Sequence, residues 1–184
     1  MLISEYGNGM TSQIEEFENK YGIKFDDEYR LFLVKYNGGD TPNTSFKSGK
    51  HSETVRCLFG INSKRNIEDN NEHFDLKKNE CVPIGMDNFG NYYAIGISRE
   101  NNGAIFFCNH EKGFSKAKIS DSFKEFISKC KSEPIDDFAK KTPEEIEKIM
   151  IEKGRGNIIT ETLRATWKKQ YEKYKDMTQE EVVL

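Results

Sequence analysis

Three short apolar runs, separated by clusters of turn-forming residues, constrain the fold of this chain more than any other feature. The runs fall at residues 81–86, 92–97 and 104–109. Apolar runs of this length, bounded by Asn, Asp and Gly, are typical of consecutive antiparallel strands. In the first turn, Asp and Asn side chains can bond their own backbone, and Gly90 can adopt a positive φ. The stretch therefore predicts three consecutive antiparallel strands.

Amphipathic helices are predicted on both sides of these strands. The first begins at a capping box on Ser12 and ends at Gly22, and the second is capped by Asp26 and ended by Gly38. A third, after the strands, is capped by Ser122. The apolar positions, which recur at helical spacing, are Ile14, Phe17 and Tyr21, then Tyr29, Phe32, Leu33 and Tyr36, and then Phe123, Phe126, Ile127 and Cys130.

The segments between these elements carry weaker patterns. Residues 40–53 are polar and are expected to form a loop. Residues 55–61 and 116–119 are expected to be strands, and residues 67–74 a short helix.

Pro134 marks the predicted boundary of a second region. Thr142 is followed by Pro143 and two Glu residues, a sequence typical of a helix start, and a longer helix is expected from about 160 to 174. Its aromatic face, formed by Trp167, Tyr171 and Tyr174, is expected either to pack internally or to bind a partner. No strand is expected in this tail. We therefore expect a domain at residues 1–131 and a helical extension at 132–184, packed on the domain or on a partner.

Composition excludes several classes of protein. The net charge of −3 lacks the basic surplus of a nucleic-acid binder. No apolar run approaches the roughly 18 residues that span a bilayer, and the N-terminus has no secretory-signal pattern. The four cysteines lack zinc or redox spacing and are expected to be buried, reduced thiols. A cytoplasmic protein without membrane or direct nucleic-acid contact is expected.

Six motifs in a fixed order resemble the SUKH superfamily, of the Smi–Knr type. They lie at residues 14–22, 27–33, 36–39, 82–91, 103–111 and 122–127. The resemblance covers about residues 13–131 and implies an α+β fold, with a twisted, mainly antiparallel sheet flanked by helices. Most bacterial members resemble immunity proteins that neutralise toxin domains, often nucleases or deaminases. Fungal members are similar to regulators of cell-wall glucan synthesis.

Catalysis and metal binding are not expected. His110 and Glu111 could form an acid–base pair, but catalysis would also require a nucleophile or oriented water and a group that fixes the imidazole. Cys108 is two residues away, and one strand does not usually place a thiol and an imidazole in attack geometry. The three His residues are far apart in sequence, without the spacing of metal ligands. We therefore expect no enzyme activity, no cofactor and no metal.

Polar residues near the predicted turns are the candidates for partner binding. They are Tyr36, Asn37, Asp40, Asp87, Asn88, Asn91, His110 and Glu111. Turn chemistry alone explains the group at 87–91, although a rigid turn is also a good platform for binding residues. The first forty residues hold eight acidic and four basic side chains. That bias reflects either helix capping or a negative surface that meets a basic toxin.

Two main functions are consistent with these expectations. The first is an immunity protein that neutralises a toxin domain, encoded nearby, by stoichiometric occlusion. The alternative is a cytoplasmic scaffold or regulatory module related to the cell-wall synthesis regulators. A small hydrolase or ligand-binding domain that uses His110 is a third hypothesis. The oligomeric state is left open.

Overall fold

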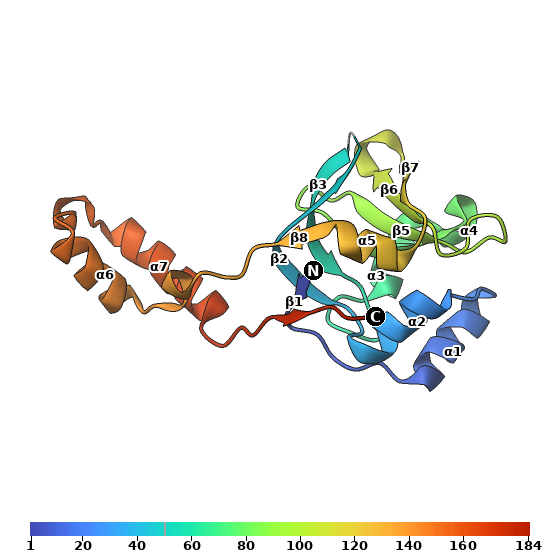
Figure 1. Ribbon diagram of the computed structural model, residues 1–184, viewed down its shortest axis with the longest axis horizontal. Coiled ribbons are helices and arrows are strands. Elements are labelled where there is room, and N and C mark those ends of the chain that lie inside the picture. Colours follow the sequence, from blue (N-terminus) through green and yellow to red (C-terminus); the bar gives the residue numbers. More distant parts are fainter. Residues whose placement is uncertain (50) are drawn as a thin grey trace. The chain divides into compact units, whose positions relative to one another are not determined.

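The computed structural model describes residues 1–49 and 51–184. The chain forms two compact units (Figure 1). The first unit comprises Met1–Glu133 together with Gln179–Leu184, and the second comprises Pro134–Thr178. No helix within the described ranges is long and apolar enough to cross a lipid bilayer.

The first unit is built on a curled, antiparallel sheet of seven strands in the order β7-β6-β5-β4-β3-β2-β8 (Figure 1). The strands are β2 (Gly39–Ser48), β3 (His51–Leu58), β4 (Cys81–Met86), β5 (Tyr92–Gly96), β6 (Ile105–Asn109), β7 (Ser115–Ser120) and β8 (Cys130–Ser132). The three predicted strands are β4, β5 and β6, and they are neighbours in the sheet. The α+β class and the antiparallel sheet are thereby confirmed.

Residues 40–53 lie mostly in a hairpin of β2 and β3, so the predicted polar loop is wrong. Phe46 pairs with Glu53 across the hairpin and is fully buried, with its ring 5.2 Å from that of Phe126. The polar residues of β2 were misleading because this strand pairs with β3 on one side and, at Thr44–Phe46, with β8 on the other. Lys50, within the predicted loop, is outside the described residues.

Helices of the first unit cover the sheet with the predicted apolar stripes. They are α1 (Thr11–Tyr21), α2 (Asp27–Lys35), α3 (Ile67–Phe74), α4 (Leu76–Asn79) and α5 (Phe123–Lys129), with a 3₁₀ turn η1 (His110–Lys112). Asp26 caps α2 by accepting the Tyr29 N–H at 2.8 Å, as predicted. The capping box at Ser12 is wrong, because α1 begins at Thr11 and its N-cap is Met10, which contributes no side-chain cap.

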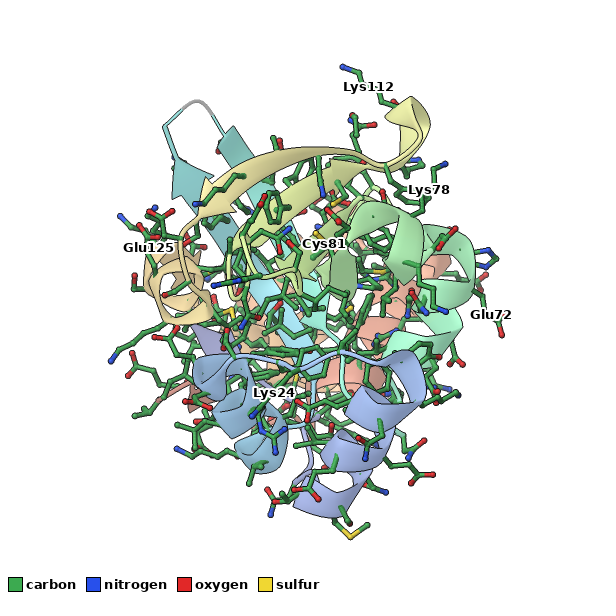
Figure 2. The ribbon with its side chains drawn as sticks, turned by 90° about the vertical axis from the view of Figure 1, so that its right-hand side faces the viewer. Lys24, Glu72, Lys78, Cys81, Lys112 and Glu125 are labelled. Atoms are coloured by element: carbon green, nitrogen blue, oxygen red, sulfur yellow. The ribbon has the colours of Figure 1, made fainter. Side chains whose placement is uncertain are left out.

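Aromatic side chains fill the core between α2, α5 and the sheet. The rings of Phe32 and Phe123 lie 5.1 Å apart, and those of Tyr93 and Phe126 5.2 Å apart, within the range of favourable aromatic pairs. All four cysteines are buried and free. Burial raises the pKa of Cys108 to about 12, so this thiol stays protonated at neutral pH. Figure 2 shows Cys81 in the interior, whereas Glu72, Lys112 and Glu125 lie at the outline of the molecule.

The end of the chain returns to the first unit and forms a strand, where the sequence predicted none. Strand β9 (Glu180–Glu181) pairs with β1 (Leu2–Ile3) in a separate two-stranded sheet. The Tyr36 hydroxyl donates to the Glu181 carbonyl at 3.2 Å and accepts the Val183 N–H at 3.1 Å. Two consecutive Glu residues give no strand pattern, and only the partners from the other end of the chain create this strand.

The second unit is a helical hairpin. It contains α6 (Pro143–Glu152) and α7 (Glu161–Tyr174), with the 3₁₀ turns η2 (Asp137–Lys140) and η3 (Gly156–Ile158). Thr142 and Glu145 form a capping box, so the predicted helix start is confirmed. Ile146 and Trp167 are buried, and Arg164 joins the two helices through bonds of 2.8 and 2.7 Å to Glu147. The aromatic face of α7 therefore contributes at least Trp167 to internal packing.

Candidate functional site

The eight predicted partner-binding residues separate into two groups in the first unit. Tyr36, Asn37 and Asp40 lie at the end of α2 and the start of β2, and the other five lie at the β4–β5 turn and after β6. The two groups differ in exposure, and that difference decides which residues a partner can reach.

In the first group, the side chains of Tyr36 and Asn37 hold the fold together. Tyr36 is fully buried, and its hydroxyl binds the C-terminal strand. The Asn37 amide donates to the Ile61 carbonyl at 2.9 Å and accepts the Ile61 N–H at 2.8 Å. Asn37 has a φ of 45°, and Gly38 follows with 87°, so the chain reverses tightly after α2. These contacts give both side chains a structural role.

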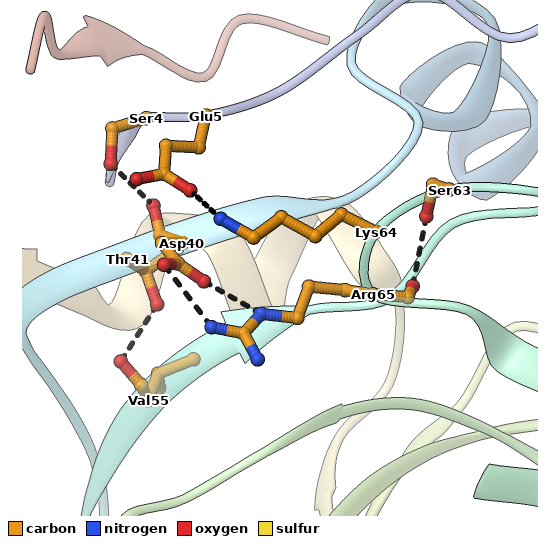
Figure 3. Close-up of polar contacts among 8 residues, drawn as sticks. All are labelled: Ser4, Glu5, Asp40, Thr41, Val55, Ser63, Lys64 and Arg65. Carbon is orange, nitrogen blue, oxygen red and sulfur yellow. Dashed lines mark hydrogen bonds and ion pairs between the residues drawn. The ribbon is translucent and has the colours of Figure 1, made fainter. Parts of the chain in front are cut away.

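Asp40 forms an ion pair with Arg65 (Figure 3). Arg65 also lines a polar hollow. The guanidinium of Arg65 donates to both carboxylate oxygens, at 2.9 and 3.3 Å, and this pairing raises the pKa of Arg65. The neighbouring Lys64 pairs with Glu5. The hollow has a volume of about 320 Å³ and is lined in part by Glu5, Asn37, Lys64 and Arg65. Both of its cations are neutralised by carboxylates of the same chain, which weakens any attraction for a charged ligand.

The second group is organised around a buried carboxylate. Asp87 is fully buried, and its Oδ1 accepts the N–H groups of Phe89 and Asn91, each at 2.8 Å. Its Oδ2 accepts the side-chain amide of Asn91 at 2.7 Å. Because three N–H groups satisfy this carboxylate, the turn is held in one conformation. The turn chemistry predicted from residues 87–91 is confirmed, including the positive φ of 91° at Gly90.

Asn91 also connects the turn to His110. Its Oδ1 accepts the His110 N–H at 3.2 Å and lies 2.9 Å from Nδ1 of the ring. The Asn91 amide orientation is set by Asp87, since only the NH₂ group can face the carboxylate. The oxygen therefore faces the imidazole, and Nδ1 carries the proton. This arrangement leaves the Nε2 atom of an exposed ring as the nitrogen that a partner can bind.

Four side chains on this platform are exposed. They are Asn88, Phe89, His110 and Glu111, and we call them the turn surface. Phe89 is 71% exposed, the highest value among the exposed large apolar side chains described. The Asn88 N–H donates to Thr54 on β3 at 3.2 Å, so a third element supports the turn. Sequence reasoning named the neighbours of Phe89 but missed Phe89 itself. Its signal was a large aromatic residue inside a turn whose chemistry does not need one.

The chemistry of the turn surface favours binding over catalysis. The His110 ring is fixed by an amide oxygen rather than by a carboxylate, so it lacks the partner that stabilises an imidazolium during general-base catalysis. Cys108 is buried, and its raised pKa disfavours the thiolate that a nucleophile requires. Within the described parts of the chain, no three His, Cys, Asp or Glu side chains gather in a way that could hold a metal ion.

Comparison with known protein families gives a match over most of the first unit. The model of the SMI1 / KNR4 family (SUKH-1) matches residues 11–129. The matched range starts at the first residue of α1 and ends at the last residue of α5, so it includes the turn surface and covers more than half of the chain. No curated protein matches the chain. The helical hairpin of the second unit lies outside the matched range.

Proposed function

Since the chain belongs to the SMI1 / KNR4 family (SUKH-1), we propose that it is an immunity protein. It binds a cognate toxin domain, such as a nuclease or a deaminase, in the cytoplasm of the cell that makes both proteins. It neutralises the toxin by stoichiometric occlusion of the active site or of the path to it. Proteins of this family are immunity or regulatory proteins, and the turn surface favours protein binding over chemistry.

The exposed side chain of Phe89 on a rigid turn is the observation that carries this proposal. Aromatic residues are enriched among the few side chains that dominate binding energy at interfaces. A side chain held on an ordered turn loses little conformational freedom on binding, which improves affinity without adding contacts. The Asp87 network and the Thr54 contact provide that order before any partner arrives.

The predicted site residues then take two roles. Asn88, His110 and Glu111 are exposed on the same turn surface as Phe89 and contact the toxin through polar groups, among them the Nε2 atom of His110. Asp87 and Asn91 are positioning residues, because they are buried and act through the turn. Tyr36, Asn37 and Asp40 support the loop between α2 and β2 by the contacts described above. This division follows from the exposure of each side chain.

Neutralisation of a lethal enzyme requires tight binding. A nanomolar Kd corresponds to about −12 kcal/mol, and interfaces of this strength commonly bury roughly 800 Å² on each partner. The turn surface alone supplies only a part of such an interface. Neighbouring surface of the first unit must contribute the remainder.

Co-expression with toxin domains encoded beside the gene tests the proposal. We expect the wild-type chain to restore growth, and Phe89→Ala to weaken toxin binding by roughly 30-fold or more, as loss of a hot-spot residue does. Phe138→Ala is the matched control, since Phe138 is exposed but lies in the second unit. The immunity proposal is wrong if every adjacent toxin domain kills cells that contain abundant folded chain. A set of several partners of moderate affinity would then favour the scaffold or regulatory role.

A further inference from the structure

A second exposed apolar surface lies on the first unit, away from the turn residues. Among the described residues, nine large apolar side chains are exposed, and five of them come from three segments that contact one another. Met10, Leu31 and Val183 are 58%, 48% and 59% exposed. Val34 is 39% exposed and Tyr6 is 36% exposed. We call these five residues the α2 surface.

Hydrogen bonds around the end of α2 bring the three segments together. The Gly9 N–H lies 3.1 Å from the carbonyl oxygens of both Leu33 and Val34, which places the chain leading to Met10 against α2. On the other side, the Lys35 ammonium donates to the Val183 carbonyl at 3.4 Å. The ring of Tyr6 packs edge-on against that of Tyr36, with 5.3 Å between the centroids. Contiguous apolar exposure of this kind marks interaction sites more often than scattered residues do.

The outward position of Leu31 and Val34 is not required by the fold. The buried face of α2 already consists of Tyr29, Phe32 and Leu33, followed by Tyr36 at the C-cap, all with 0% exposure. Leu31 and Val34 form a second stripe at i and i+3 spacing on the other side of this helix. A helix that only covered the sheet would carry polar residues there. The second stripe is therefore free to contact a partner.

The surroundings of the α2 surface are mainly acidic. Asp27 precedes Leu31 by one helical turn and is exposed, and Glu180 and Glu181 are exposed beside Val183. Glu15 on α1 has an exposed side chain near Arg30, which is the residue before Leu31. Lys35 is a cation within the surface, Arg30 pairs with Glu15 and Glu18, and Lys24 lines the same hollow as Asp27. An apolar centre with a charged rim is the common anatomy of a protein interface, and here the rim is predominantly negative.

We propose that the α2 surface docks a basic protein partner with an apolar centre. This inference rests on the proposed function and specifies it, since it makes the cognate toxin domain basic and places α2 in the interface. A second copy of the chain fits poorly. In a two-fold symmetric interface the same acidic rim would face itself, and such like-charge contacts are unfavourable. With a basic partner, the rim accelerates encounter and the apolar centre retains the complex.

Binding kinetics with an inactive variant of the adjacent toxin domain test the proposal. Leu31→Arg removes an apolar contact and adds a charge that repels a basic partner, so we expect the Kd to rise by roughly 30-fold or more. Ile151→Arg is the matched control, because Ile151 is 58% exposed on α6 of the second unit. We expect it to bind like the wild type. Circular dichroism and thermal unfolding of each variant establish that the fold is intact.

Salt dependence separates the charged rim from the apolar centre. We expect the association rate to fall as NaCl rises, and Asp27→Asn to slow association several-fold at low salt and little at high salt. The effect of Leu31→Arg on dissociation should persist at high salt, where the repulsion is screened and the lost apolar contact remains. An association rate that does not change with salt would contradict a basic partner.

The outcomes distinguish this inference from the immunity function itself. If the wild-type chain binds the toxin and Leu31→Arg binds it within about twofold, the docking inference is wrong and the immunity function stands. If the wild-type chain binds no adjacent toxin domain, both proposals fail. Sedimentation of the chain alone supplies the third outcome: a wild-type dimer that Leu31→Arg converts to a monomer would assign the surface to a second copy and overturn the basic partner.

Discussion

Different interactions stabilise the two units of the chain. The first unit buries a continuous aromatic core under helices and sheet, and many of its large side chains have 0% exposure. In the second unit the buried apolar side chains are Ile135, Ile146, Trp167 and Met177, and only Ile146 is as well covered as the core of the first unit. Capping and ion pairs supply much of the remaining order there. Small structures bury a smaller fraction of their surface, so we expect the second unit to be the less stable one.

The composition allows each unit to be followed separately. The only tryptophan of the chain, Trp167, lies in the second unit, so its fluorescence reports unfolding there. Every strand in the described ranges belongs to the first unit, so the β-sheet signal in circular dichroism reports that unit. The comparison predicts that tryptophan fluorescence changes at lower urea than the sheet signal.

Phe126→Ala should have the largest effect on stability. The ring packs against Phe46 and Tyr93 at 5.2 Å and is fully buried, so its removal leaves a cavity. We expect the free energy of unfolding of the first unit to fall by about 3–5 kcal/mol. Urea titration followed by circular dichroism measures the loss. An equal shift in the Trp167 transition would show that the units unfold together and would remove the distinction between them.

Ile146→Ala should destabilise the second unit. Ile146 is the best-buried side chain of the hairpin, and its loss should cost about 2–5 kcal/mol, enough to unfold a unit with so small a core. Trp167 fluorescence in buffer without denaturant measures the result. The partly buried Met150 on the same helix offers a milder control, Met150→Ala. A hairpin that stays folded in Ile146→Ala would mean that caps and ion pairs stabilise it more than its core does.

Tyr36→Phe tests how the C-terminal strand is attached to the rest of the first unit. The change keeps the buried ring and removes a hydroxyl that binds both Glu181 and Val183. Two backbone groups lose a partner, and we expect a cost of about 1–2 kcal/mol, confined to the C-terminal strand. Faster hydrogen exchange at the amide of Val183 measures the opening. Unchanged exchange would show that the β1–β9 pairing holds the strand without Tyr36.

The acid stability of the first unit should depend weakly on Glu125. Its side chain binds Lys129, the Asp121 N–H and the Ser120 hydroxyl, each at 2.7 Å, and these contacts lower the pKa of Glu125 to about 2. A lowered carboxyl pKa stabilises the fold above its ordinary value of 4.5, and this contribution is lost as the pH falls toward 2. Glu125→Gln should therefore flatten the pH dependence of the sheet transition between these values. An unchanged pH profile would assign the acid sensitivity to other carboxylates.

Local sequence patterns predicted much of the fold but only part of the candidate site. The turn at residues 87–91 was predictable because its side chains bond to their own backbone. The link from Asn91 to His110 was not, since it joins the turn before β5 to the turn after β6, 19 residues apart in the chain. The exposure of Phe89 and the second stripe of α2 were missed for the same reason, because a pattern marks residues as apolar without saying what covers them.

What the sequence determined by itself were the features set by neighbours along the chain. These are the apolar stripes of α1, α2 and α5, the runs that became β4 to β6, and the cap at Thr142. The tertiary structure decided the hairpin of β2 and β3 and the strand at Glu180–Glu181, whose polar residues become strands only through pairing with distant segments. It also decided which candidate residues face outward. Exposure is a property of packing between distant segments, and no local pattern of residues contains it.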